Sequence, residues 1–320
     1  MEIPAPFLKN LLDYASYQAL DVSALNRLLT HPVVDLCDPD EMVLATDYLD
    51  VLKHLITTPN SRTTGLHIGA YLNLNSLGLV LDISLSTSSL KQGIYILEGF
   101  LRSKFPLVSS VVTQGSEHYE LKLESSVKDE KVKTELLNMT LCIVYRELKL
   151  MLPAEVPLSI RFPYSKKEDA GLFFTEEVTF SSDHVILLPK NMDELEINEK
   201  RVKDIELLLP KFVSMLNQNN INVKRFSKNV RGMALNMCNP EIPSLKQVQE
   251  QFACSERTFQ RRLTAEGTSY RQITNEIKKE LAYYLSNEKH LRTKDIAYIL
   301  GYSGSSAYLH ALKEWKEEPN

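Results

Sequence analysis

The feature that most restricts the fold of this chain is a pattern that occurs twice near its C-terminal end. The stretch SLKQVQEQFACSERTFQRRLTAEG, from Ser244, contains two short amphipathic segments separated by a few residues. The stretch TKDIAYILGYSGSSAYLHALKEW, from Thr293, repeats this layout with Gly301 at the turn. Aligning Ser255 with Ser303 places the two units 48 residues apart. A scaffold helix, a tight turn and a polar-faced second helix form the helix-turn-helix pattern, so an all-α C-terminal part is predicted.

The second helix of the first unit carries a face of basic and amide side chains. Ser255 is a favoured N-cap for a helix that runs to Ala265 and buries Phe259 and Leu263. Positions i, i+3, i+4 and i+7 then share the outer face. They are Arg257, Gln260, Arg261 and Thr264. Arginine and glutamine can each form paired hydrogen bonds to base edges, so this face suits DNA, although a solvated basic face is also compatible with these residues.

Local signals also predict where the neighbouring helices begin. Ser-x-x-Gln capping boxes are expected at Ser244 and Ser269, and Thr293 is expected to cap the scaffold helix of the second unit. The stretch TSYRQITNEIKKELAYYLSNEKH is predicted to form one long helix between the units. Two units on such a rigid spacer can enter successive major-groove faces, which lie about 34 Å apart.

The N-terminal part has a mixed pattern. Residues 5–60 are predicted to be helical, and the apolar run from Leu77 to Leu85 suits a buried strand or a tightly packed turn. Strands are predicted around Gln114-Gly115-Ser116 and in PLSIRFPY and EEVTFSSDHVILLPK, and a long helix is predicted to end at Pro153. The predicted class is α+β, with an N-terminal mixed α/β domain at 1–190, a connecting helix at 191–223 and an all-α double helix-turn-helix domain at 224–320.

Charge is unevenly distributed along the chain. The net charge is −4, but the segment from Lys224 onward has 16 Lys and Arg against 11 Asp and Glu. A basic part behind an acidic part indicates a polyanion partner. The four cysteines are widely spaced, and we identify no signal peptide and no apolar run of about 20 residues, which predicts a reduced, cytoplasmic chain. We find no catalytic constellation, metal motif or cofactor motif, so no catalytic residue, metal or cofactor is predicted.

These motifs resemble a known family. The segment from Cys254 to Trp315 is similar nearly end to end to the double helix-turn-helix of AraC/XylS-type transcription regulators, including the A-x-x-L-G-[FY]-S element that starts at Ala297. The stretches LGLVLDISLSTSSLKQGIYILEGFLR and FFTEEVTFSSDHVILLPKNMDEL resemble the arabinose-binding-domain-like α/β sensor that one branch of the family carries. The resemblance implies a bacterial, sequence-specific DNA-binding regulator that is not an enzyme.

The resemblance also implies sites. It assigns base contacts in the first unit to Arg257, Gln260 and Arg261, and in the second unit to Ser305, Ser306, Leu309 and His310. The chain departs from the family at Leu309, His310 and Glu314, and its ending is cut short at Pro319-Asn320, so weaker contacts are expected from the second unit. The sensor should bind a small-molecule effector of unknown identity. The residues suggested to line its pocket are Leu79, Leu81, Tyr95, Phe100 and Arg161.

Alternatives remain at this point. The N-terminal domain could serve dimerisation or protein contacts without a ligand, and the leucine-rich connecting helix could pair two chains or pack on its own sensor. An enzyme fused to a DNA-binding tail would need an activated cysteine, and neither Cys37 among carboxylates nor Cys142 in an apolar helix fits that role. A protein-binding module would not need two base-facing helices. The expected partners are an operator in double-stranded DNA, an effector and, for an activator, RNA polymerase; no membrane partner is expected.

Overall fold

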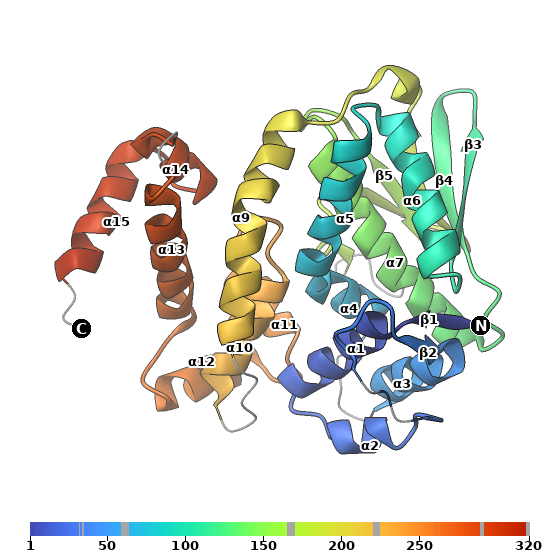
Figure 1. Ribbon diagram of the computed structural model, residues 1–320, viewed down its shortest axis with the longest axis horizontal. Coiled ribbons are helices and arrows are strands. Elements are labelled where there is room, and N and C mark those ends of the chain that lie inside the picture. Colours follow the sequence, from blue (N-terminus) through green and yellow to red (C-terminus); the bar gives the residue numbers. More distant parts are fainter. Residues whose placement is uncertain are drawn as a thin grey trace.

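The structure is a computed structural model that describes residues 1–31, 33, 35–58, 64–164, 170–219, 225–288 and 291–317. It contains a mixed α/β part, one long helix and a helical C-terminal part, which follow one another from right to left in Figure 1. The predicted α+β class is confirmed.

Helices make up most of the N-terminal part. The start of the chain forms a small antiparallel pair of strands, β1 (Glu2–Pro4) and β2 (Met42–Leu44). In this pair Ile3 lies opposite Val43. Neither short strand was predicted, and β2 lies within the region that was expected to be helical. The helices are α1 (Ala5–Tyr17), α2 (Val22–Asn26), α3 (Ala45–Thr57), α4 (Gly65–Tyr71), α5 (Asn73–Ser86), α6 (Leu90–Lys104) and α7 (Glu130–Met151).

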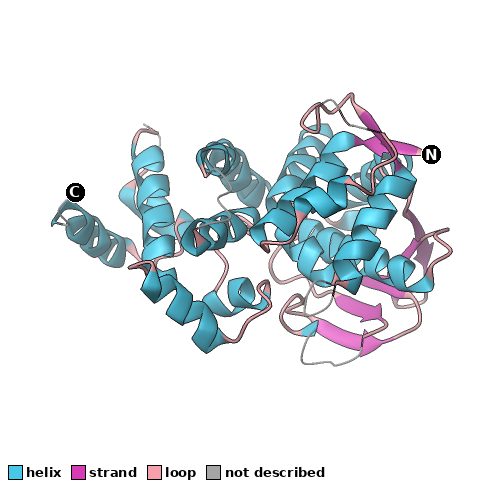
Figure 2. Cartoon of the chain, turned by 90° about the horizontal axis from the view of Figure 1, so that it is seen from below, coloured by secondary structure: helices cyan, strands magenta, loops and turns pink. Residues whose placement is uncertain are grey.

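One five-stranded sheet lies on one side of these helices (Figure 2). The strand order is β3-β4-β7-β5-β6, and β5 and β6 run parallel while the other neighbours are antiparallel. The predicted hairpin and later strands are therefore confirmed. The strands are β3 (Ser109–Gln114), β4 (His118–Glu124), β5 (Ser159–Phe162), β6 (Glu177–Phe180) and β7 (His184–Pro189). Helix α7, predicted as the long helix before Pro153, packs on β4 and β7.

The predicted strand or turn at Leu77–Leu85 is wrong, because these residues lie in helix α5. Leu77, Val80 and Ile83 are fully buried, and Leu79 and Leu81 are also packed against the core. Helix α5 contacts α6, α7 and α9, so apolar residues occupy most of its circumference. A short apolar run of this kind lacks the helical period that would distinguish it from a buried strand.

The rest of the chain is helical where it is described. The predicted connecting helix is α9 (Glu199–Gln218), preceded by a short 3₁₀ turn at Met192–Glu194. The C-terminal helices are α10 (Phe226–Asn236), α11 (Leu245–Glu250), α12 (Glu256–Ala265), α13 (Tyr270–Ser286), α14 (Thr293–Ile299) and α15 (Ser305–Glu317).

The predicted helix starts are mostly confirmed. Ser244 and Gln247 form the expected capping box, and the Ser269 hydroxyl accepts a hydrogen bond from the Gln272 amide. Thr293 is not the N-cap of α14. The cap is Arg292, whose backbone N–H donates to the Asp295 carboxylate at 3.0 Å, so the acidic side chain replaces the hydroxyl at this terminus.

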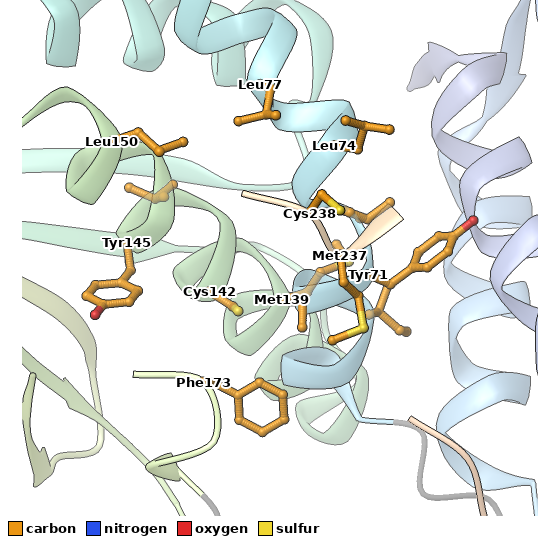
Figure 3. Packing of buried hydrophobic residues seen from close by; sticks show 14 of the residues in the cluster. Tyr71, Leu74, Leu77, Met139, Cys142, Tyr145, Leu150, Phe173, Met237 and Cys238 are labelled. Carbon is orange, nitrogen blue, oxygen red and sulfur yellow. The ribbon is translucent and has the colours of Figure 1, made fainter. Parts of the chain in front are cut away.

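The hydrophobic core continues from the N-terminal part into the C-terminal part. Met237 and Cys238, which follow α10, belong to the same buried cluster as Tyr71 and Leu74. Figure 3 shows these side chains near Met139 and other α7 residues. The first helix-turn-helix unit therefore shares buried surface with the α/β part.

Candidate nucleic-acid interface and candidate effector pocket

Three aromatic rings hold the first helix-turn-helix unit together. Phe226 in α10, Phe252 after α11 and Phe259 in α12 pack with ring centroids 5.2 to 5.6 Å apart. Phe259 is completely buried. Ser255 caps α12 by accepting a hydrogen bond from the Thr258 amide at 3.2 Å, as the sequence predicts. These contacts fix the orientation of α12 on its scaffold.

The opposite face of α12 is open to solvent. Its four predicted DNA-binding residues, Arg257, Gln260, Arg261 and Thr264, are all exposed. The Gln260 amide donates to the Glu256 carboxylate at 3.0 Å, and the Thr264 hydroxyl donates to the Gln260 backbone carbonyl at 3.0 Å. Two guanidinium groups therefore stand on one side of a helix whose other side is anchored by aromatic packing.

Arg262 has a different environment from its neighbour Arg261. Its guanidinium lies over the Phe226 ring, 3.7 Å from the ring centroid. One turn later, the Glu266 carboxylate accepts hydrogen bonds from the Phe226 and Ser227 amides, at 2.7 and 2.9 Å. Arg262 and Glu266 thus brace the start of α10, and Arg262 faces the flank of the unit.

The second unit presents a weaker set of groups. Gly301 occupies the turn with φ +71°, a conformation that favours glycine. On α15, Ser306, Leu309 and His310 are exposed and Ser305 is half-buried. The His310 ring nitrogen Nδ1 lies 3.6 Å from the Glu314 carboxylate. A carboxylate beside His310 reduces the attraction of this side chain for phosphate. The predicted departure at Pro319-Asn320 lies outside the described residues.

Two of the five residues suggested to bind an effector line a common cavity. Leu79 and Phe100 belong to the wall of a space of about 120 Å³ between α1, α3, α5, α6 and α7. Leu81 is not part of this wall, Tyr95 is 56% exposed on α6, and Arg161 lies on β5 with its guanidinium 3.5 Å from Glu120. The suggestion assumed a turn after a strand, whereas α5 directs Leu79 and Leu81 to different sides.

The cavity contains a side chain that sequence reasoning missed. Glu147 of α7 lines it and is 1% exposed, and its Oε2 atom has no hydrogen-bond partner among the described residues. Burial raises the pKa of Glu147 to about 8. The spacing of α7 carries a signal for this, because Thr140, Val144 and Glu147 follow one another at helical intervals on a face that is otherwise apolar.

The helices that line the cavity also hold the first unit. From α1, the Tyr14 hydroxyl donates to the Gln251 amide oxygen at 3.4 Å, and the Gln18 amide donates to the Gln251 backbone carbonyl. From α5, the Asn73 amide donates to the Met237 backbone carbonyl at 2.9 Å. Hydrogen bonds therefore link α1 and α5, which line the cavity, to the segments on either side of α11.

Gly232 marks the closest approach between the two parts. A Cβ atom at this position of α10 would lie 2.3 Å from the Tyr17 ring. We expect Gly232→Ala to lower the free energy of unfolding by about 1–3 kcal/mol and to separate α10 from α1, because a rigid ring must move. Chemical denaturation followed by circular dichroism measures this effect.

Gly78→Ala in α5 is the matched control, because nothing lies within 4 Å of a Cβ atom there. That change should be neutral or stabilising, by up to about 1 kcal/mol, since alanine favours a helix. Equal stability of the two variants would show that α10 does not rest on Tyr17 in solution.

Comparison with known proteins identifies the family of the α/β part. Residues 20–192 match the model of the arabinose-binding domain of AraC transcription regulators, which is more than half of the chain. The chain belongs to the AraC family. This AraC-family protein is a transcription regulator and not an enzyme, in agreement with the sequence.

Relatives of this AraC-family chain are bacterial regulators. It is 37% identical over 75 residues to the HTH-type transcriptional regulator VqsM of Pseudomonas aeruginosa. The aligned region covers 23% of this chain and 23% of that protein. The chain thus spans about a quarter of that relative. It is 22% identical over 295 residues to the uncharacterized HTH-type transcriptional regulator Rv1395 of Mycobacterium tuberculosis, covering 88% of this chain and 84% of that protein. The crystal structure of the regulator CdpR from Pseudomonas aeruginosa aligns over 97% of this chain and 95% of its own, with 20% identity and a TM-score of 0.42.

The described residues contain neither a membrane-spanning single helix nor a cluster of metal ligands. No single helix among them is long and apolar enough to cross a membrane, although the bent pair α4 and α5 reaches the required length and composition together. Within the same residues, no group of three or more His, Cys, Asp or Glu side chains could hold a metal ion.

Proposed function

We propose that this regulator binds specific sequences in double-stranded DNA through its C-terminal part and is controlled by a small molecule bound in its N-terminal part. The proposal divides the chain into a sensor at 1–190, a connecting helix at 191–223 and a DNA-binding domain at 224–320. The observation that carries it is the exposed face of α12, where Arg257, Gln260 and Arg261 project from a capped helix anchored by three aromatic rings. A bacterial protein with this function acts in the cytoplasm.

Base recognition by α12 is supported by the chemistry of its face. Arg257 and Arg261 can bind guanine through O6 and N7, and Gln260 can bind adenine through N6 and N7. Thr264 extends the same face by one turn. In α15, we assign weaker contacts to Ser305, Ser306, Leu309 and His310, with Leu309 able to meet a thymine methyl group.

Control by an effector is supported by the cavity and its position. Leu79 and Phe100 line a space of about 120 Å³, and the helices around it also hold α10 and α11. A ligand that binds better to one spacing of these helices shifts the protein toward one arrangement of the first unit. The alternative is a ligand-independent regulator whose N-terminal part serves protein contacts.

Pairing of two chains through α9 is a weaker part of the proposal. Leu208 and Phe212 are buried within the same chain, while Val213 is 44% exposed. This burial favours packing of α9 on its own sensor over the predicted homodimer. RNA polymerase remains a partner only if the protein activates transcription.

The experiment that tests the proposal is selection of binding sites from random duplex DNA with the full chain. We expect enrichment of a sequence with two half-sites about one helical turn apart. The half-site that faces α12 should carry the stronger base preference. Failure to enrich any sequence would remove the proposed function.

Substitution of neighbouring arginines separates base contacts from structural contacts. We expect Arg261→Ala to cost about 1–3 kcal/mol on the selected site and to relax preference at one or two base pairs. Arg262→Ala should weaken binding to all sequences alike, because its guanidinium stacks on Phe226 and supports the unit. Binding titrations against the selected site and its single-base variants measure both effects.

His310→Ala provides a comparison in the second unit and should cost less than Arg261→Ala, since Glu314 lies beside His310. A larger loss from His310→Ala, or unchanged base preference in Arg261→Ala, would show that α12 does not determine the base specificity.

A further inference from the structure

The cavity beneath α5 has an unusual charge character. Its wall contains one carboxyl group, that of Glu147, and no lysine, arginine or histidine. Arg146, the nearest base along α7, donates instead to the Ala70 backbone carbonyl at 3.4 Å. The other titratable side chain in the wall is Tyr48, whose pKa is raised by burial. The wall therefore has no cationic side chain that could neutralise the charge of an anionic ligand.

The carboxyl group of Glu147 has an unused hydrogen-bonding atom that faces no protein partner among the described residues. It is 1% exposed, and its buried Oε2 atom has no hydrogen-bond partner among the described residues. The hydroxyl of Tyr48, which is also in the wall, donates to the Met139 sulfur at 3.7 Å. Buried polar atoms are nearly always hydrogen-bonded, so an orphaned carboxyl oxygen in a cavity indicates a polar group on a ligand.

Aliphatic side chains and aromatic rings form most of the remaining wall. Phe105 packs against Phe7 at 4.9 Å and against Tyr48 at 5.5 Å between ring centroids, and Phe100 also lines the space. Faces of aromatic rings attract cations, and they also pack well against hydrocarbon. A carboxyl group in a wall of this kind is suited to an ammonium group attached to an apolar body.

We propose that the effector is a small organic amine whose ammonium group donates to Glu147 Oε2 and whose hydrocarbon body packs against Phe7, Phe100 and Phe105. This inference rests on the proposed effector function of the cavity and names its ligand class. The cavity of about 120 Å³ limits the ligand to roughly the size of a benzene ring, since an engineered cavity of about 150 Å³ in another protein holds benzene.

The inference predicts a proton signature. A simple amine is protonated at pH 7, as lysine is, whereas Glu147 is mostly neutral there because burial raises its pKa to about 8. Binding of an ammonium ion should ionise Glu147 and release close to one proton. An alcohol of the same shape should release none.

The test uses the full chain and three probes with as many non-hydrogen atoms as benzene: cyclopentylamine, cyclopentanol and cyclopropanecarboxylate. Isothermal titration at pH 7 in two buffers of different ionisation enthalpy gives affinity and proton release. We expect cyclopentylamine to bind most tightly, with release of close to one proton. Glu147→Gln should weaken the amine roughly ten- to hundredfold, the range expected for loss of a charge-assisted hydrogen bond.

Glu130→Gln is the matched control, because it makes the same change on the same helix at a side chain that is 79% exposed. It should bind the amine as the unsubstituted chain does. Equal or tighter binding of the alcohol or the carboxylate, amine binding without proton release, or full amine affinity in Glu147→Gln would each overturn the inference. Because these titrations contain no DNA, their failure is distinct from a failure to select an operator.

Discussion

Phe259→Ala is expected to lower the free energy of unfolding of the first helix-turn-helix unit by about 3–5 kcal/mol. Phe259 is completely buried, and its ring meets Phe226 edge-on at 5.3 Å and Phe252 at 5.6 Å. Its removal leaves a cavity where α12 packs against α10 and the segment that follows α11. Specific DNA binding should be lost together with stability, because α12 is no longer held at a fixed angle. Urea denaturation followed by circular dichroism measures the first effect.

Phe180→Ala on β6 is the control, since that ring is 67% exposed. It should change stability by less than about 0.5 kcal/mol. If both variants showed the same small loss, the three rings would not form the core of the unit.

Glu147→Gln is expected to stabilise the protein increasingly as pH rises. Burial raises the pKa of Glu147 from 4.5 to about 8, so between these values the folded state holds a proton that the unfolded state has lost. Stability therefore falls as pH increases, by about 1.4 kcal/mol per pH unit for this group. Glutamine does not titrate and removes this dependence. The unfolding free energy of the variant minus that of the unsubstituted chain should therefore rise by about 3 kcal/mol between pH 4.5 and pH 7.

Denaturation of both proteins at several pH values between 4.5 and 8 measures this difference. The comparison isolates Glu147, because His184 and all other groups titrate equally in the two proteins. His184 itself contributes an opposite slope at low pH, since burial lowers its pKa to about 4. A constant difference across this range would mean that Glu147 is hydrated or paired in solution.

The helix-turn-helix units were predictable because their signals are local. Ser255 as an N-cap, the inner position of Phe259 and the exposure of Arg261 all follow from helical spacing within ten residues. The cap at Arg292 was missed because threonine is a common N-cap residue. The group that bonds the start of this helix is instead the carboxylate of Asp295, which accepts from the Arg292 backbone N–H.

The sensor was less predictable because its features depend on distant contacts. Helix α5 is surrounded by α6, α7 and α9, which removes the periodicity that identifies a helix. Leu79 and Phe100 line one cavity, but the exposure of Tyr95 and the orphaned carboxyl of Glu147 appear only when the helices are assembled. Gly232 and Tyr17 are far apart in the sequence, so no local residue pattern predicts their contact.

The unequal attachment of the two helix-turn-helix units has a consequence for the kinetics of DNA binding. Hydrogen bonds from α1 and α5 hold the first unit against the sensor, whereas α14 and α15 lie beyond α9 and α13 (Figures 1 and 2). A segment with fewer contacts to the main body moves at a lower free-energy cost. If the proposed DNA binding holds, α12 engages a duplex as a preset element and α15 follows in a separate step. Because α12 carries the stronger set of base-contacting groups, the rate at which α12 leaves the duplex then sets the lifetime of the complex.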